Sequence, residues 1–187
     1  MAKIIALQHR ESDWVAACLK GNRTAQRQVY EHYAGKMLGV CLRYVRGRED
    51  AEEVLALAFV KVFARMADYR SEGSFEGWIR TIVVREALTF LRTHKNVFDA
   101  LEEDRLDAPS LATTDDQHGL DALLQLVQAL PTGYRTVFNL HALEGYSHQE
   151  IAVMLNISES TSKSQLFKAR NTLQMWLGAQ SRKEVER

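Results

Sequence analysis

Residues 146–173 read YSHQEIAVMLNISESTSKSQLFKARNTL, and this stretch decides the fold. Ser147 and Glu150 form a capping box, in which each side chain satisfies a free backbone N–H group, so a helix is predicted to begin at Ser147. Asn156 is predicted to end that helix, and Ser158 offers the N-cap of a second one. The stretch therefore predicts two helices joined by a tight turn.

The second of these helices is predicted to have one apolar side and one polar side. Leu166, Ala169 and Leu173 recur at helical spacing and lie on one side. The other side has cations suited to phosphates, and hydroxyl and amide groups suited to base edges, although an ordinary solvated face looks similar. Such a helix fits the major groove of DNA. The candidate DNA-binding residues are Ser160, Thr161, Lys163, Ser164, Gln165, Phe167, Lys168 and Asn171.

The composition is that of a helical protein without an overall basic charge. The chain has 187 residues, 46% of them hydrophobic, and only two prolines, which suits one or two compact and mainly helical domains. Its formal net charge is zero. Non-specific affinity for DNA increases with the number of phosphates neutralised, so we expect it to be weak and a partner to assist binding. Acidic residues crowd residues 98–121, which predicts a flexible acidic linker.

Residues 50–66 predict a helix with two apolar faces. Leu55 and Phe59 lie on the face expected to join the core. The opposite face is apolar at Ala56, Leu57 and Val60, where contact with solvent would favour charged residues. Two interpretations stay open. Exposed apolar patches often mark interfaces, but a helix buried on both sides in one domain has the same pattern.

Residues 77–95 read GWIRTIVVREALTFLRTHK and predict a further helix after a loop rich in glycine and serine. Its cationic row contains Arg85, Thr89 and Arg92, with Trp78 and Ile82 beside it. Cations next to an aromatic ring suit a single nucleic-acid strand, because backbone charge and base stacking are met together. A solvated basic face is the alternative.

Two parts of the chain resemble the two domains of sigma factors, in the family's order. Residues 130–152, LPTGYRTVFNLHALEGYSHQEIA, and 157–170, ISESTSKSQLFKAR, resemble the promoter-binding C-terminal domain of the extracytoplasmic-function group. The N-terminal domain is matched by DAEE at residues 50–53, by Ser74, Phe75 and Trp78, and by the Leu91-Arg92 pair.

The resemblance implies an all-α protein of two helical domains joined by an acidic flexible linker. Residues 1–96 would form a domain like sigma region 2, and residues 97–119 the linker. Residues 120–187 would form a helix-turn-helix domain like sigma region 4, with a polar tail that we expect to fray.

The resemblance also implies roles for the candidate residues. The protein would bind bacterial core RNA polymerase and direct it to promoter DNA, and family members are often held inactive by an anti-sigma factor. The second helix of residues 146–173 would read the minus-thirty-five element. The minus-ten element would be held by Trp78, Ile82, Arg85, Thr89 and Arg92. Core polymerase would be bound by Asp50, Glu53, Ala56, Leu57 and Val60.

The sequence departs from the family at several of these positions. The family commonly has Gln and an acid in place of Ala56 and Leu57, and Asn and Asp in place of Arg85 and Thr89. Recognition-helix positions 160, 162 and 165 also differ. Two alternatives therefore stay open: a sigma-like DNA-binding regulator that does not programme initiation, and an interaction protein whose apolar face binds a regulator.

Catalytic and metal-binding patterns are absent from the sequence. No nucleotide-binding loop, hydrolase nucleophile motif or zinc-protease motif occurs, so we expect neither an enzyme nor a cofactor. His141 and His148 have no third ligand nearby, so no metal site is expected. Cys18 and Cys41 are predicted to be small buried hydrophobes. The first ten residues are too weakly apolar for a signal peptide or a membrane span, so we expect a cytoplasmic protein without membrane insertion.

Overall fold

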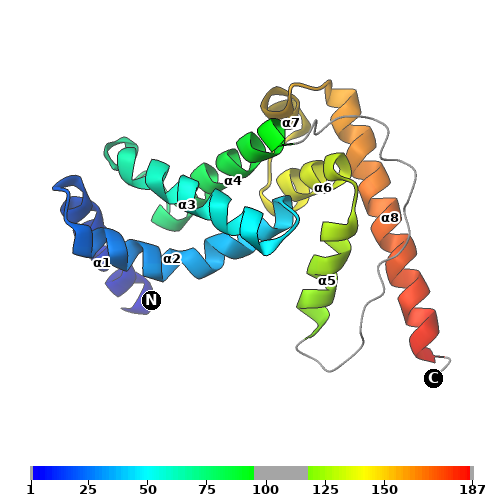
Figure 1. The fold of residues 1–187 in the computed structure, drawn as a ribbon, viewed down its shortest axis with the longest axis horizontal. Coiled ribbons are helices and arrows are strands. Elements are labelled where there is room, and N and C mark those ends of the chain that lie inside the picture. The colour runs from blue at the N-terminus through cyan, green and yellow to red at the C-terminus, as the bar shows by residue number, and fades with distance from the viewer. Residues whose placement is uncertain (1, 95–117, 186–187) are drawn as a thin grey trace. The chain divides into compact units, whose positions relative to one another are not determined.

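The computed structural model describes residues 2–94 and 118–185, and every regular element among them is helical (Figure 1). The all-α prediction is confirmed. The chain divides into two compact units, Met1–Phe90 and Leu91–Arg187, which are considered separately below. The domain boundaries predicted from the sequence remain predictions, and nearly all of the predicted acidic linker lies outside the described residues.

The first unit is built on long helices. Asn22 caps the second of them, because its side-chain oxygen accepts hydrogen bonds from the backbone N–H groups of Thr24 and Ala25 at 2.9 and 3.1 Å. The elements are α1 (Ala2–Leu19), α2 (Arg23–Tyr44), α3 (Arg48–Ala64), a short 3-10 turn (Met66–Asp68) and α4 (Phe75–His94), whose last residues pass the boundary of the unit.

One boundary in this unit differs from the sequence-based expectation. Ser12, followed by Trp14, Val15, Cys18 and Leu19 at helical spacing, predicts a helix that begins at residue 12, but α1 already begins at Ala2, so Ser12 lies inside it. The end of α1 is marked clearly. Gly21, with a φ of +74°, turns the chain into α2 in a conformation that side chains rarely adopt.

The core of the first unit lies between α2, α3 and α4. Tyr33 of α2 packs edge-on against Phe75 of α4, with ring centroids 5.7 Å apart. Both cysteines are buried and free, as expected for small hydrophobes, and burial raises the pKa of the Cys41 thiol to about 12. Other buried members are Val29, Met37, Val54, Leu55, Phe59, Val62, Ile79, Val83 and Ala87.

The second unit contains α5 (His118–Ala129), α6 (Thr132–Phe138) with a π-helical continuation (Asn139–Leu143), α7 (His148–Leu155) and α8 (Glu159–Val185). Pro131 immediately precedes α6 and is its N-cap residue. The predicted frayed tail is not observed as far as residue 185, because α8 continues to that point.

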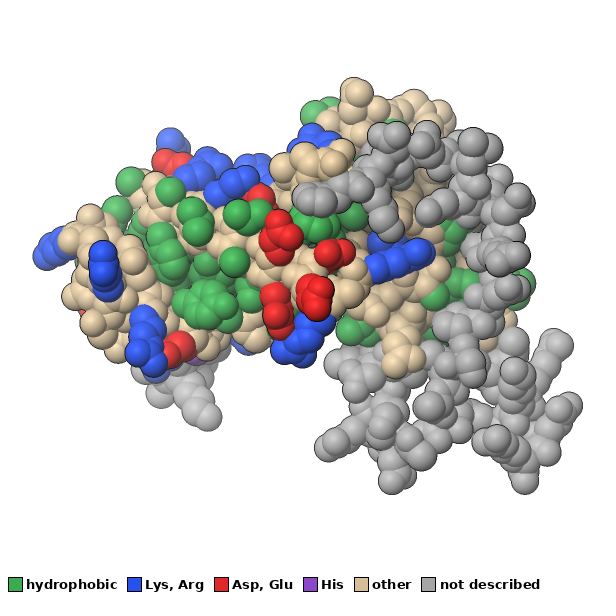
Figure 2. All heavy atoms as spheres, viewed as in Figure 1, with side chains coloured by type: hydrophobic (Ala, Val, Ile, Leu, Met, Phe, Trp, Pro, Cys, Tyr) green, Lys and Arg blue, Asp and Glu red, His purple; other side chains and the backbone are tan. Residues whose placement is uncertain are grey.

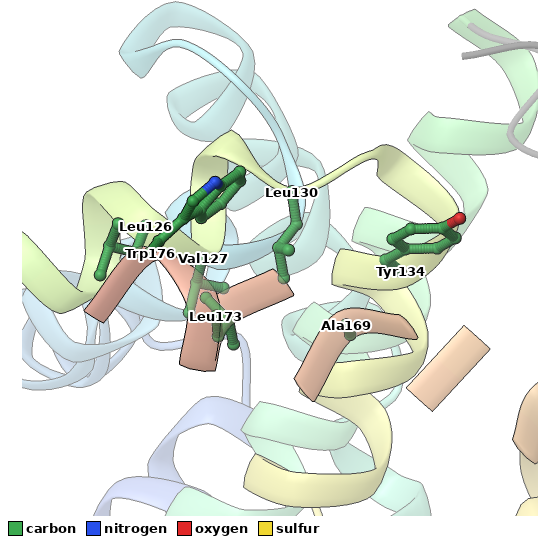
Figure 3. Packing of buried hydrophobic residues seen from close by; sticks show 7 residues of the cluster. All are labelled: Leu126, Val127, Leu130, Tyr134, Ala169, Leu173 and Trp176. Carbon is green, nitrogen blue, oxygen red and sulfur yellow. The ribbon is translucent and has the colours of Figure 1, made fainter. Parts of the chain in front are cut away.

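The core of the second unit holds α8 against α5 and α6. Figure 3 shows its side chains, which meet from the three helices. The fully buried Arg135 of α6 donates hydrogen bonds from one guanidinium nitrogen to the carbonyl oxygens of Gln128 and Leu130, at 2.9 and 3.3 Å. It thereby satisfies carbonyls at the end of α5 that the helix itself leaves unpaired. The core residues are Leu126, Val127, Leu130, Tyr134, Ala169, Leu173 and Trp176.

Two leucines one helical turn apart in α8 provide a matched test of this core. Leu173 is 6% exposed and belongs to the core, whereas Leu177 is 44% exposed. We expect Leu173→Ala to lower the free energy of unfolding of the second unit by about 2–5 kcal/mol, because it leaves a cavity, and Leu177→Ala by less than about 1 kcal/mol. Urea unfolding followed by tryptophan fluorescence measures both, and equal effects would contradict the packing described.

Candidate nucleic-acid interface

The predicted capping box at the start of α7 is present. The Ser147 hydroxyl accepts a hydrogen bond from the Glu150 backbone N–H at 3.3 Å, and the Glu150 carboxylate accepts one from the Ser147 backbone N–H at 2.8 Å. The Ser147 hydroxyl also donates to this carboxylate, at 2.7 Å. The two bonds from Ser147, backbone first, lower the pKa of Glu150. Helix α7 therefore has a well-defined start.

The turn between α7 and α8 also forms as the sequence predicts. Asn156 ends α7 in the left-handed region, with a φ of +54°, and its N–H donates to the carbonyl oxygen of Ala152. Ser158 precedes α8, and its hydroxyl oxygen accepts a hydrogen bond from the Thr161 N–H at 2.9 Å. These two local contacts set the point at which the second helix begins.

The first turns of α8 present a polar row to solvent. Phe167 stands in this row with 65% of its surface exposed, although it is aromatic. The Lys163 ammonium pairs with Glu159 at 2.7 Å, and the Lys168 ammonium lies 5.7 Å from the centre of the Tyr134 ring. The exposed members of the row are Ser160, Lys163, Ser164, Phe167, Lys168 and Asn171.

Two residues predicted for this row are less exposed than the rest. Thr161 is half-buried, and its N–H and hydroxyl both contact Ser158 in the N-cap. Gln165 is half-buried and lies against Gly133 of α6, where an added Cβ atom would lie 3.0 Å from the amide oxygen. That oxygen is buried without a hydrogen-bond partner among the described residues. The glycine leaves space on α6, and the Gln165 side chain occupies it.

Helix α4 presents most of its predicted nucleic-acid residues. Arg85 and Arg92 are exposed, and Thr89 is half-exposed, with its hydroxyl donating to the Arg85 carbonyl oxygen at 2.9 Å. Trp78 is half-buried and stacks on Phe75, with ring centroids 5.8 Å apart. The cationic row is therefore accessible, with one aromatic edge beside it.

Ile82 departs from this prediction. It is 6% exposed and belongs to the core, so its side chain does not line the cationic row. The physical reason is its position in the helix, because Ile82 follows Ile79 by three residues and adjoins Val83, both of which are completely buried.

Helix α3 leaves its second apolar face uncovered. Leu57 is 43% exposed and Val60 66%, so the alternative of a helix buried on both sides within this unit is wrong. Tyr30 of α2 is also exposed, and its ring packs on the buried Phe59 with centroids 4.8 Å apart. Figure 2 shows hydrophobic side chains gathered over this unit beside acidic ones. Asp50, Glu53 and Ala56 are exposed as well. We call this set the polymerase face, after the role that the resemblance to sigma factors predicts for it; it comprises Asp50, Glu53, Ala56, Leu57 and Val60.

Comparison with known families identifies the family of this chain. Residues 29–97 match the family model of sigma-70 region 2, and residues 120–173 match that of sigma-70 region 4. The chain belongs to the sigma-70 family. It is a sigma factor of the extracytoplasmic-function group, a class that directs promoter recognition and the initiation of transcription.

Individual sigma factors resemble the chain over most of its length. It is 25% identical to the RNA polymerase sigma-H factor of Pseudomonas aeruginosa, covering 89% of this chain and 93% of that one. The sigma-E factor of Escherichia coli K12 is also 25% identical, over 82% and 87% of the two chains. In structure, the sigma factor RpoE of Bartonella quintana, solved with the anti-sigma factor NepR, matches with a TM-score of 0.52. It shares 20% sequence identity, over 81% of this chain and 96% of that one.

The sigma-70 match places the polymerase face and the cationic row of α4 in region 2, and the α7–α8 pair in region 4. Residues 2–94 and 118–185 contain no group of three or more His, Cys, Asp or Glu side chains able to hold a metal ion. No helix in the described part of this sigma factor is both long and apolar enough to cross a membrane.

Sequence reasoning missed one contact in region 4. Ser162 of α8 is completely buried, and its hydroxyl lies 2.9 Å from Nδ1 of His148 in α7. Neither a periodic pattern nor a known motif links positions 148 and 162, because the contact exists only after α7 and α8 have packed together. The sole signal was that His141 and His148 flank the turn.

The capping box offers a direct test of how α7 is held. We expect Ser147→Ala to lower the free energy of unfolding of the second unit by about 1 kcal/mol, because the Glu150 backbone N–H loses its acceptor and the Glu150 carboxylate loses the hydroxyl donor. Ser147→Thr keeps a hydroxyl and should stay within about 0.5 kcal/mol of the wild type. Urea unfolding measures both variants. If threonine and alanine destabilise equally, the hydroxyl is not the stabilising group.

Proposed function

We propose that the three surfaces divide the work of this sigma factor. The polymerase face docks on core RNA polymerase, the cationic row of α4 holds the unpaired strand of the minus-ten element, and the polar row of α8 reads the minus-thirty-five element. The observation that carries the proposal is that all three surfaces are exposed on one chain, each within the matching sigma region.

Docking through the polymerase face follows from its composition. Leu57 and Val60 expose apolar surface, whose removal from water contributes about 25 cal/mol for each Å². Asp50 and Glu53 flank this surface with negative charge, which favours a partner that presents cations. Such a surface suits a protein partner and is unsuited to DNA, whose phosphates would be repelled.

The DNA-facing surfaces have the opposite character. In α4, Arg85 and Arg92 supply charge for a phosphate backbone, and Trp78 offers an aromatic edge, where stacking is worth about 1–3 kcal/mol for each base. In α8, Lys163 and Lys168 suit phosphates, while Ser160, Ser164 and Asn171 suit base edges.

The balance of charge makes the polymerase essential to this scheme. With a net charge of zero, the chain has little non-specific attraction to DNA. In this proposal the chain acts as a binding subunit of the polymerase and not as an enzyme, and it works in the cytoplasm, where core polymerase is found. An anti-sigma factor that covered the polymerase face would keep it inactive.

The first experiment combines purified protein with bacterial core RNA polymerase. Co-elution, together with discrete transcripts from a fragmented library of the source genome, would support the proposal, and the aligned upstream sequences would give both promoter elements. Binding to DNA without binding to core polymerase would instead favour the sigma-like regulator. The residues that motivate this alternative are those at which the chain departs from the family, Ala56, Leu57, Arg85 and Thr89.

A charge placed in the polymerase face should prevent docking. We expect Leu57→Asp to weaken binding to core polymerase by about tenfold to a hundredfold, because a carboxylate would be buried in an apolar contact. Leu19→Asp is the matched control, since Leu19 is an exposed leucine at the end of α1. Competition with labelled wild-type protein measures both affinities. Unimpaired binding by Leu57→Asp would exclude this face as the docking site.

A cation removed from α8 should weaken contact with DNA phosphates. We expect Lys168→Ala to lower the affinity of the holoenzyme for its promoter and to reduce the salt dependence by about one unit of slope. Lys20→Ala, in the first unit, is the control and should change neither quantity. Binding titrations at several salt concentrations provide both values. An unchanged slope would remove Lys168 from the phosphate-contacting set.

A further inference from the structure

Two histidines and a serine connect three elements beside the recognition helix α8. His141, in the π-helical continuation of α6, stacks on His148, with ring centroids 4.5 Å apart and an angle of 12° between the rings. His148 is the first residue of α7 and lies 2.9 Å, through Nδ1, from the hydroxyl of Ser162 in α8. The chain of contacts therefore runs from α6 through α7 to the first turn of α8.

The hydrogen bonds fix the orientation of the first ring. Nδ1 of His141 lies 2.9 Å from the carbonyl oxygen of Tyr146. A carbonyl oxygen can only accept, so this nitrogen carries a proton and donates it. The His141 ring is thereby held in the plane on which His148 stacks.

The second ring supplies a partner that Ser162 needs. The Ser162 side chain is completely buried, and a buried hydroxyl without a hydrogen bond is costly. The hydroxyl forms a hydrogen bond with His148 Nδ1. Ser162 adjoins Lys163 of the polar row, so a shift of this serine moves the row with it.

The surroundings favour the neutral form of His148. Burial, the neighbouring His141 and Lys163 of α8, in that order, lower the pKa of His148, and Arg170 acts in the same direction. Glu159 of α8 opposes them. The position of His148 in the first turn of α7 adds the positive end of the helix dipole.

We propose that neutral His148 is a positioning residue. Through Ser162 it holds the first turn of the recognition helix α8 in position, and His141 supports it by stacking. The DNA-reading part of this inference rests on the proposed function of α8. His148 does not itself need to touch a base. It acts through Ser162 on the side chains that do.

The sign of the pH dependence follows from the contacts. A histidine whose pKa is lower in the folded protein stabilises the fold when neutral, so the full contribution is present above the ordinary pKa of about 6.5. It is lost as the pH falls below that value, because the positive charge of protonated His148 then faces His141 and Lys163. Acid should therefore loosen the start of α8 and leave its core-facing turns in place.

Amide hydrogen exchange on the full chain tests the positioning without DNA. After correction for the intrinsic effect of pH, we expect exchange at residues 162–166, relative to 169–173, to rise about tenfold between about pH 7.5 and about pH 5.5. His148→Asn keeps a hydrogen-bonding side chain that does not titrate, so it should abolish the rise. His32→Gln, in the first unit, is the control and should retain it. No rise in the wild type, or an equal rise in His148→Asn, would overturn the proposal.

Promoter binding supplies a second readout. The probes are the upstream element recovered in the transcription experiment and a permuted duplex of the same composition. Protonated histidines strengthen binding to both duplexes, so the ratio of the two affinities isolates the positioning. We expect this ratio to fall about tenfold over the same pH interval in the wild type and to stay level in His148→Asn. If the ratio of the two affinities does not change with pH in the wild type, the DNA-reading part of the inference is overturned.

If the wild type binds the upstream element and the permuted duplex equally at about pH 7.5, the proposed function of α8 is contradicted instead. Hydrogen exchange would still decide whether His148 positions α8.

Discussion

The burial of one side of α8 against α5 and α6 is the constraint on which the second unit depends. Ala169, Leu173 and Trp176 enter the core, and this fixes the rotation of the whole helix about its axis. Since successive residues are about 100° apart, the same rotation decides which side chains face outward. Lys163 and Phe167 are exposed because other residues of α8 are buried. The apolar core thus determines where the candidate DNA-reading surface lies.

In helix α3, too, the packing of one side determines which residues are exposed on the other, but here the exposed residues are apolar. Its inner side packs Val54, Leu55 and Val62 into the first unit, and this packing leaves Leu57 and Val60 outside. Apolar side chains left exposed in this way add little to the stability of the unit, which agrees with the proposed role of this face in binding a partner. The neutral charge of the chain agrees with this, because specificity for DNA is then obtained within a larger complex.

Local chemistry could be predicted from the sequence, whereas contacts between elements could not. The Ser147 capping box, the stop at Asn156 and the cap at Ser158 depend on neighbours within four residues, and all three form as expected. Gln165 and Ile82 were placed correctly on their helices but proved less exposed than expected. For Gln165 the reason is Gly133, which lies 32 positions earlier and leaves room on α6. The two functional regions were identified from composite motifs. The geometry within them depends on partners that sequence spacing does not reveal.

The division of α8 into a packed side and a solvent row has an evolutionary consequence. Side chains such as Ser160, Ser164 and Asn171 are exposed, so their replacement costs the fold little. If these residues read the promoter as proposed, promoter preference can drift through single substitutions that leave the fold intact. Duplicated copies of such a gene could acquire separate target sets while keeping one scaffold.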